Sequence, residues 1–128
     1  MNKLFEKLTN QLAETIDSSV ALALHNKNQE VEVIHLLWAL LTNTNSVLNQ
    51  LLNKMNVDKI AIELEVKSSA NKLSSVSSVT KENIKLSRNV VHSLEKAEGQ
   101  AAKQGDKFIA IDSWLISNFD SKELKEIL

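Results

Sequence analysis

Apolar side chains recur at helical spacing along almost the whole chain. In residues 3–25 they return every four positions, which places them on one face of a helix. This first stripe consists of Leu4, Leu8, Leu12, Ile16 and Val20. A second stripe of the same kind lies within residues 81–104 and consists of Leu86, Val90, Leu94, Ala97 and Ala101. The pattern predicts a long amphipathic helix over each range, the second capped by Thr80 and ended by Gly105.

Five shorter helices complete the predicted set. They cover residues 33–42, 46–54, 57–73 and 111–119 and a last stretch that begins near Ser121. Residues 33–42 are almost entirely apolar, which predicts a buried helix that follows a short extended segment at 31–33. Asn56 is the predicted N-cap of the 57–73 helix. The buried side of that helix is expected to consist of Val57, Ile60, Ala61, Leu64 and Leu73.

The two halves of the sequence repeat each other. A shift of 78 positions places Val31 on Ile109 and Leu37 on Leu115, and it brings the two long stripes into register. Such a fixed period indicates a duplicated structural unit. We therefore predict an all-α fold in which two tandem helical repeats pack in pseudo-twofold fashion within a single domain, residues 1–128.

Repeat one is predicted to span residues 1–74 with four helices, and repeat two residues 80–128 with three. The serine-rich segment 75–79 links them and is too short for two independent domains to move apart. Because repeat two has no counterpart of the fourth helix, we expect it to be truncated from a longer protein. The apolar residues of its last helix would then lack an obvious cover; they are Leu124, Ile127 and Leu128.

Composition agrees with a helical domain and excludes several classes of function. The chain has no proline and only two glycines, which favours long helices over a sheet with many tight turns. The net charge is −1 and no basic stripe stands out, so we expect no nucleic-acid partner. No apolar run approaches the roughly 20 residues that cross a bilayer, so we expect no membrane span. The absence of cysteine excludes disulfides and suits a reducing, cytoplasmic compartment.

The residues that could carry chemistry do not form a recognisable catalytic pattern. Two glycines cannot build a phosphate-binding loop, and no serine lies in a nucleophile elbow. The histidines His25, His35 and His92 are far apart and form no metal-binding pair. We therefore expect no catalysis, cofactor or metal in these residues. Trp38 and Trp114 are expected in the core, the alternative being that one of them borders a binding groove.

Two long segments resemble a known family. Residues 4–41, LFEKLTNQLAETIDSSVALALHNKNQEVEVIHLLWALL, and residues 87–117, SRNVVHSLEKAEGQAAKQGDKFIAIDSWLIS, resemble the two repeats of the Clp N-terminal domain. This double Clp repeat begins the Clp/Hsp100 AAA+ unfoldases. Within the family, LTNQLA and GDKFIA are most similar to the ClpB disaggregases, with ClpC and ClpA as near neighbours. One departure is Val33, where the family often has proline.

The resemblance implies a non-catalytic domain joined by a flexible linker to two ATPase modules in a homohexamer. ATP and Mg would bind in those modules only. The domain would bind unfolded or aggregated polypeptide weakly and deliver it to the central pore, and a DnaK-type chaperone system would work with other domains. Two alternatives stay open: an adaptor- or substrate-docking module of a ClpA/ClpC-type unfoldase, and a plain structural spacer.

The resemblance also implies a site. In ClpB-like domains a polar trio is tied to aggregate handling, and its positions match Thr9, Asp106 and Asp112. The third position is a glutamate in many relatives. Simpler roles compete with this one: Thr9 could bond back to a carbonyl of its own helix, and the aspartates could close a turn or face a helix dipole. The apolar candidates for a groove near the second-repeat loop are Leu94, Ile109, Ile111 and Trp114.

Overall fold

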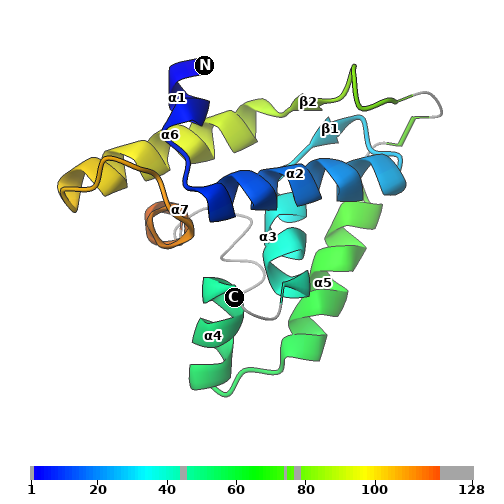
Figure 1. Cartoon of the computed structure of the whole chain (residues 1–128). Coiled ribbons are helices and arrows are strands. Elements are labelled where there is room, and N and C mark those ends of the chain that lie inside the picture. Colours follow the sequence, from blue (N-terminus) through cyan, green and yellow to red (C-terminus); the bar gives the residue numbers. More distant parts are fainter. Residues whose placement is uncertain (1, 44–45, 74, 77–78, 119–128) are drawn as a thin grey trace.

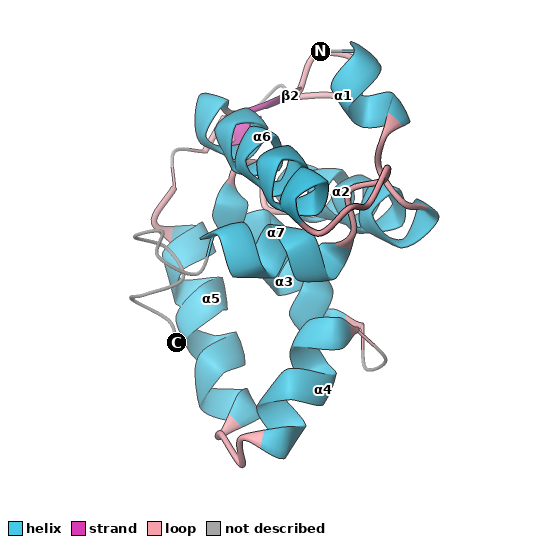
Figure 2. Ribbon diagram, turned by 90° about the vertical axis from the view of Figure 1, so that its left-hand side faces the viewer, coloured by secondary structure: helices cyan, strands magenta, loops and turns pink. Residues whose placement is uncertain are grey.

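The structure is a computed structural model that describes residues 2–43, 46–73, 75–76 and 79–118. Its helices are α1 Asn2–Glu6, α2 Asn10–His25, α3 Val33–Thr42, α4 Val47–Lys54, α5 Lys59–Asn71, α6 Arg88–Lys103 and α7 Ile111–Asn118. Two short strands, β1 Glu30–Val31 and β2 Lys85–Leu86, pair in parallel. The predicted all-α class is confirmed (Figures 1 and 2). The helix expected from Ser121, with Leu124, Ile127 and Leu128, lies outside the described residues.

The helix predicted over residues 3–25 is broken near its start. Residues 7–9 leave the helical path because their main chain pairs with the second-repeat loop: Ile109 donates its N–H to the Lys7 carbonyl at 2.7 Å, and Thr9 donates to the Ile109 carbonyl at 2.9 Å. Thr9 is then the N-cap of α2, and its Oγ1 accepts the Leu12 N–H at 3.3 Å. The alternative role of Thr9, a bond back to a carbonyl of its own helix, is therefore replaced by an N-cap.

The helix predicted over residues 81–104 is shortened in the same way. Lys85 and Leu86 form β2 against β1, and Ser87 donates its N–H to the Val31 carbonyl at 2.9 Å. Ser87 is the N-cap of α6 and accepts the Val90 N–H on its Oγ at 3.2 Å. Thr80, the predicted cap, instead lies in a turn before β2. The 78-residue shift places Thr9 on Ser87 and Ile109 on Val31, so the two breaks are equivalent.

The duplication extends to the ends of the long helices. Helix α6 begins and ends 78 residues after α2, as the shift predicts. Each ends in a Schellman motif, whose outer bond runs from Asn28 N–H to the Ala23 carbonyl in one repeat and from Asp106 N–H to the Ala101 carbonyl in the other, both at 2.9 Å. These matching caps and the reciprocal pairing of each repeat's loop with the other's helix start confirm the pseudo-twofold arrangement.

The two Schellman motifs differ in the residue that adopts the left-handed backbone. It is Gly105, with φ 78°, after α6 and Lys27, with φ 56°, after α2. A side chain in this region costs about 1 kcal/mol relative to glycine, and a Cβ on Gly105 would touch nothing within 4 Å. We expect Lys27→Gly to raise the free energy of unfolding by about 1 kcal/mol and Gly105→Ala to lower it equally, measured by urea denaturation. Equal signs for the two changes would contradict this account.

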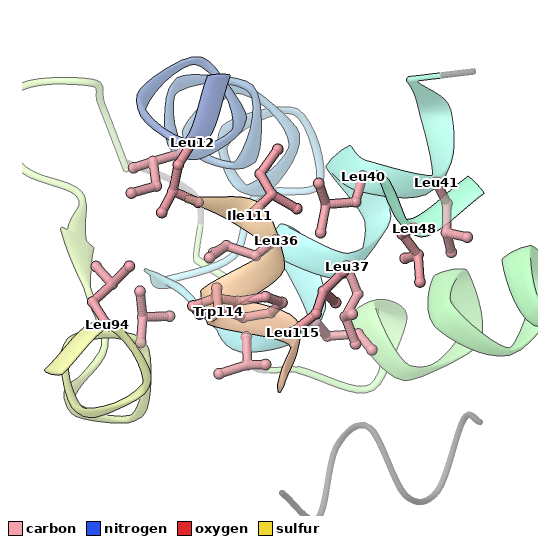
Figure 3. Close-up of a cluster of buried hydrophobic side chains, with 14 of the residues drawn as sticks. Leu12, Leu36, Leu37, Leu40, Leu41, Leu48, Leu94, Ile111, Trp114 and Leu115 are labelled. Carbon is pink, nitrogen blue, oxygen red and sulfur yellow. The ribbon is translucent and has the colours of Figure 1, made fainter. Parts of the chain in front are cut away.

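The core lies where α3, α6 and α7 meet beneath α2, and Figure 3 shows its side chains. Helix α3 is buried along nearly its whole length, with bounds as predicted. Trp114 is 0% exposed, and its indole N–H donates to Ser93 Oγ at 2.9 Å, so its predicted core role is confirmed. Trp38 is half-buried and packs against the same core. Burying each such large apolar side chain contributes about 1.5–3 kcal/mol.

Helix α5 turns a different face to the core from the one predicted. Its buried residues are Ile62, Val66 and Ala70, whereas Ile60 and Leu64 are 71% and 63% exposed. The helix also starts later than expected, with Asp58 as its N-cap, while Asn56 has the left-handed φ of 54°. Both sets of apolar residues have helical spacing, so periodicity did not distinguish them.

A buried histidine fixes the first-repeat loop, which is residues 26–32 between α2 and α3. His35 is 0% exposed; its Nδ1 accepts the Glu32 N–H at 2.8 Å, so its Nε2 carries the proton and donates to Asn28 Oδ1 at 2.9 Å. Asn26 Nδ2 donates to the same Asn28 oxygen at 2.9 Å and to the Ala70 carbonyl of α5. Burial lowers the pKa of His35 to about 4. This network starts α3 where the family often has proline.

Candidate functional site

The candidate site is built on the loop between α6 and α7. Gly105 turns the chain out of α6, and residues 106–110 then cross to the start of α7. Midway, Ile109 is 1% exposed and exchanges two main-chain hydrogen bonds with the Lys7–Thr9 segment. The loop is therefore anchored at its centre, and its outer side chains are held in position next to the start of α2.

The structure places the predicted polar trio around this junction. Thr9 caps α2 and is bonded through its main chain to the loop; Asp106 is exposed at the loop's first position; Asp112 is exposed in the first turn of α7. Asp106 closes the Schellman motif with its main-chain N–H, which leaves its carboxylate outside that motif. Asp112 Oδ1 accepts the Ser113 N–H at 2.8 Å, in keeping with a helix start. The binding role of the trio stays a prediction.

The apolar candidates lie beneath the loop. Leu94 and Trp114 are 0% exposed, so neither lines an open groove in this structure. The reason is that both belong to the face of their helix that packs between α6 and α7 (Figure 3). Ile109 borders a cavity of about 320 Å³ beside α6, and Ile111 borders a polar cavity of about 400 Å³ beside α2. A groove role for these two stays a prediction.

Two features of the site were missed by the sequence analysis. Phe108, at the outer side of the loop, is 57% exposed, which is high for a phenylalanine. Lys7 and Glu98 form an ion pair of 2.8 Å across the cavity that Ile109 and Asp106 also line. Phe108 could have been found from its place in the GDKFIA loop, outside both helical stripes. Nothing in the sequence signals a pair 91 residues apart.

The groups at this junction are apolar, polar and charged side chains. Within residues 2–43, 46–73, 75–76 and 79–118, no three acidic or histidine side chains gather in a way that would hold a metal ion. None of the helices in the described ranges is long and apolar enough to cross a membrane. The junction thus offers an exposed aromatic ring, two carboxylates, a hydroxyl and an ion pair.

The comparison with models of protein families shows to which family this chain belongs. A model of the Clp repeat (R) N-terminal domain matches residues 7–128. The chain belongs to the Clp N-terminal domain family. The resemblance stated from the sequence is thereby confirmed.

Relatives of this Clp N-terminal domain are found among chaperones. It is 54% identical over 123 residues to the chaperone protein ClpB of Wolinella succinogenes, covering 96% of this chain and 14% of that protein. The crystal structure of the Hsp104 N-terminal domain from Candida albicans superimposes with a TM-score of 0.83 at 22% identity, covering 94% of this chain and 79% of that one.

A second structural neighbour carries a ligand. The complex of a ClpV N-domain with a VipB peptide superimposes with a TM-score of 0.77 at 18% identity, covering 96% of this chain and 74% of that one. The likeness to these two structures shows the fold of the Clp N-terminal domain. The chain spans about one seventh of the length of its ClpB relative.

Proposed function

We propose that this Clp N-terminal domain engages substrate for a ClpB-type ATP-dependent protein disaggregase. It binds unfolded or aggregated polypeptide weakly and delivers it to the pore of an AAA+ homohexamer. Its own residues catalyse nothing; ATP and Mg act in the AAA+ modules of the whole protein. The observation that carries the proposal is the anchored loop, which holds the exposed Phe108 between Asp106 and Asp112.

Anchoring matters because it reduces the entropy that binding would otherwise cost. The two main-chain bonds to Ile109 hold the loop before a ligand arrives, so an unfolded client has to order only itself. Phe108 offers an apolar ring to any large side chain, without selecting a sequence. The carboxylates on either side and the Thr9 hydroxyl, which can still donate its proton, offer hydrogen bonds to the client's main chain.

The family relationship supports the same assignment. The resemblance to ClpB-like domains implies that Thr9, Asp106 and Asp112 act in aggregate handling, and the relative with 54% identity is a ClpB chaperone. The ClpV N-domain, of the same fold, binds a peptide from VipB. Six copies in a hexamer would multiply a weak contact into a strong one.

The proposal predicts weak binding that depends on Phe108. In titrations of the ¹⁵N-labelled chain with a reduced, carboxymethylated protein that stays unfolded, we expect a dissociation constant of about 100 µM. Amide shifts should cluster at residues 9 and 106–112. Phe108→Ser should weaken binding about fivefold, because roughly 1 kcal/mol of apolar contact is lost. Leu64→Ser, which alters a similarly exposed side chain on α5, is the matched control and should change nothing.

The alternatives give different results in the same titration. Nanomolar binding of one client segment to the monomer would contradict the proposal. An adaptor-docking domain of the ClpA/ClpC type would show no shifts with the unfolded protein. A structural spacer would show none either, and deleting it from the whole protein would leave disaggregation unchanged.

A further inference from the structure

The two repeats each have a groove beside their long helix, and the grooves correspond under the 78-residue shift. In repeat two this is the cavity of about 320 Å³ beside α6. In repeat one it lies between α2 and β2 and measures about 510 Å³; we call it the α2–β2 groove. Figure 1 shows β1 and β2 beside the C-terminal half of α2. Four lining positions are equivalent in the two grooves. The cavity beside α6 has Lys7, Glu98, Ala102 and Ile109, and the α2–β2 groove has, in the same order, Lys85, Val20, Leu24 and Val31.

The two grooves have diverged in chemistry. In repeat two, Lys7 is neutralised by Glu98 at 2.8 Å, and the small Ala102 follows one turn later. In repeat one, Val20 takes the place of the acid and Leu24 that of the alanine. The lining of the α2–β2 groove is consequently mostly apolar. Its large apolar residues are Ile16, Val20, Leu24, Val31, Ile84 and Leu86.

The charge at the rim of the α2–β2 groove is left uncompensated. Lys85 occupies the position of Lys7, but the residue equivalent to its partner is Val20. Lys81 lies on the same rim, and Asp17 is the one acid among the described residues that line the groove. Among the described residues, no ion pair joins Lys81, Lys85 or Asp17 to a side chain of opposite charge. Two cations against one anion favour a ligand that brings a carboxylate.

We infer that the α2–β2 groove is a second peptide-binding site, for a short segment with a large apolar residue next to an acidic one. The apolar side chain enters between α2 and β2, and the ligand's carboxylate takes the place at Lys85 that Glu98 takes at Lys7. The inference rests on the proposed function, because it assumes that the domain binds polypeptide, and it adds a contact on the repeat opposite the first site.

The test uses two synthetic peptides on the ¹⁵N-labelled chain. One has the acetylated and amidated sequence Gly-Ser-Leu-Phe-Asp-Ser-Gly, and the other has lysine in place of aspartate. We expect the acidic peptide to shift the amides of residues 20, 24 and 84–86 and to bind about threefold tighter than the basic one. Val20→Glu supplies Lys85 with the acid that repeat two has, and should weaken the acidic peptide at least tenfold. Lys96→Ala, at an exposed lysine on α6, is the matched control.

The outcomes separate this inference from the proposed function. Shifts only at residues 9 and 106–112 would overturn the second site and leave the first standing. Shifts only at the α2–β2 groove would overturn the first site and leave the second standing. If neither peptide nor the unfolded protein shifted amides at either place, both sites would be overturned. Because Val20→Glu could unfold the chain, Lys85→Glu is a second variant at an exposed position. Equal binding of the acidic peptide to Lys85→Glu and to the unaltered chain would overturn the inference.

Discussion

Replacing Trp114 by alanine is expected to lower the free energy of unfolding by about 4 kcal/mol. Trp114 is 0% exposed and is the largest fully buried side chain among the described residues. Removing its ring leaves a cavity that the neighbouring Leu94, Leu36 and Leu115, seen around it in Figure 3, can fill only in part. A domain of this size is stabilised by about 5–15 kcal/mol, so the loss is a large share of the total.

The loss has two sources that separate variants can measure. The ring contributes burial, and its N–H contributes a hydrogen bond to Ser93 Oγ at 2.9 Å. Ser93→Ala keeps the ring but leaves the indole N–H unpaired in the core, which should cost about 1–3 kcal/mol. Ile116→Ala, on the exposed face of the same helix, is the control and should stay within about 0.5 kcal/mol of the parent.

Urea denaturation followed by far-UV circular dichroism measures all three variants. The order expected is Trp114→Ala, then Ser93→Ala, then Ile116→Ala, from most to least destabilising. If Trp114→Ala cost less than about 1.5 kcal/mol, α7 would not be part of the cooperative core. In that case the loop that α7 follows would also lack the rigid support on which the candidate site depends.

The sequence predicted helix ends correctly where the interaction that fixes the end lies within a few residues of it. The bounds of α3 followed from one continuous apolar run. The helix predicted over 46–54 is α4, which begins one residue later because the Ser46 hydroxyl caps it by accepting the Asn49 N–H. The end of α6 followed from Gly105, which adopts the left-handed backbone. In each case the deciding interaction spans only a few residues, so it can be read from a short stretch of sequence.

Contacts between residues far apart in sequence determined the helix starts and the buried face that the sequence analysis did not predict. Helical spacing continues through residues 7–9 and 85–87, yet both segments leave the helix to bond with a loop of the other repeat. The buried face of α5 was missed for a related reason, because α5 has two apolar stripes and only its contact with α3 selects one. The duplication itself was visible, and it explains why the two helix starts were mispredicted together.

The candidate site was predicted in part and through resemblance. Thr9, Asp106 and Asp112 were named from the family pattern, and the structure explains how residues so far apart in sequence reach one junction. Phe108 was overlooked, although its place outside both helical stripes could have indicated its exposure. The Lys7–Glu98 pair emerged only from the structure, because distant pairing leaves no periodic signal. The two repeats thus share one backbone frame, while single substitutions such as Val20 for Glu98 give each surface its own chemistry.

Lowering the pH from 7 to 5 is expected to remove about 2 kcal/mol of stability through His35 alone, given its folded-state pKa of about 4. In the unfolded chain the imidazole has its ordinary pKa of 6.5 and takes up a proton over this range. In the folded chain it stays neutral, because it is buried and its Nδ1 accepts the Glu32 N–H. The unfolded state therefore binds more protons, and stability falls as the pH drops from about 6.5 toward 4.

The structure shows why the folded state does not simply accept the proton. A charged imidazole would have to donate from Nδ1, where it now accepts from Glu32 N–H at 2.8 Å, so two donors would face each other. Asn28 Oδ1 would still accept from Nε2, but its other bond comes from Asn26, which ties the loop to α5. Protonation would thus break the start of α3, the most buried helix, and not merely add a surface charge.

Unfolding free energies of the parent and of His35→Gln, measured in urea between pH 7 and pH 5, isolate this contribution. The variant should be less stable at pH 7, since its network is imperfect, but should lose about 2 kcal/mol less than the parent on acidification. His92→Gln alters an exposed histidine and should keep the parent's pH dependence. If parent and His35→Gln lost stability in parallel, the protonated imidazole would be tolerated inside the fold, and the first-repeat loop would have to rearrange around it. The first-repeat loop also carries Val31, which lines the α2–β2 groove, so such a rearrangement would change the shape of that groove.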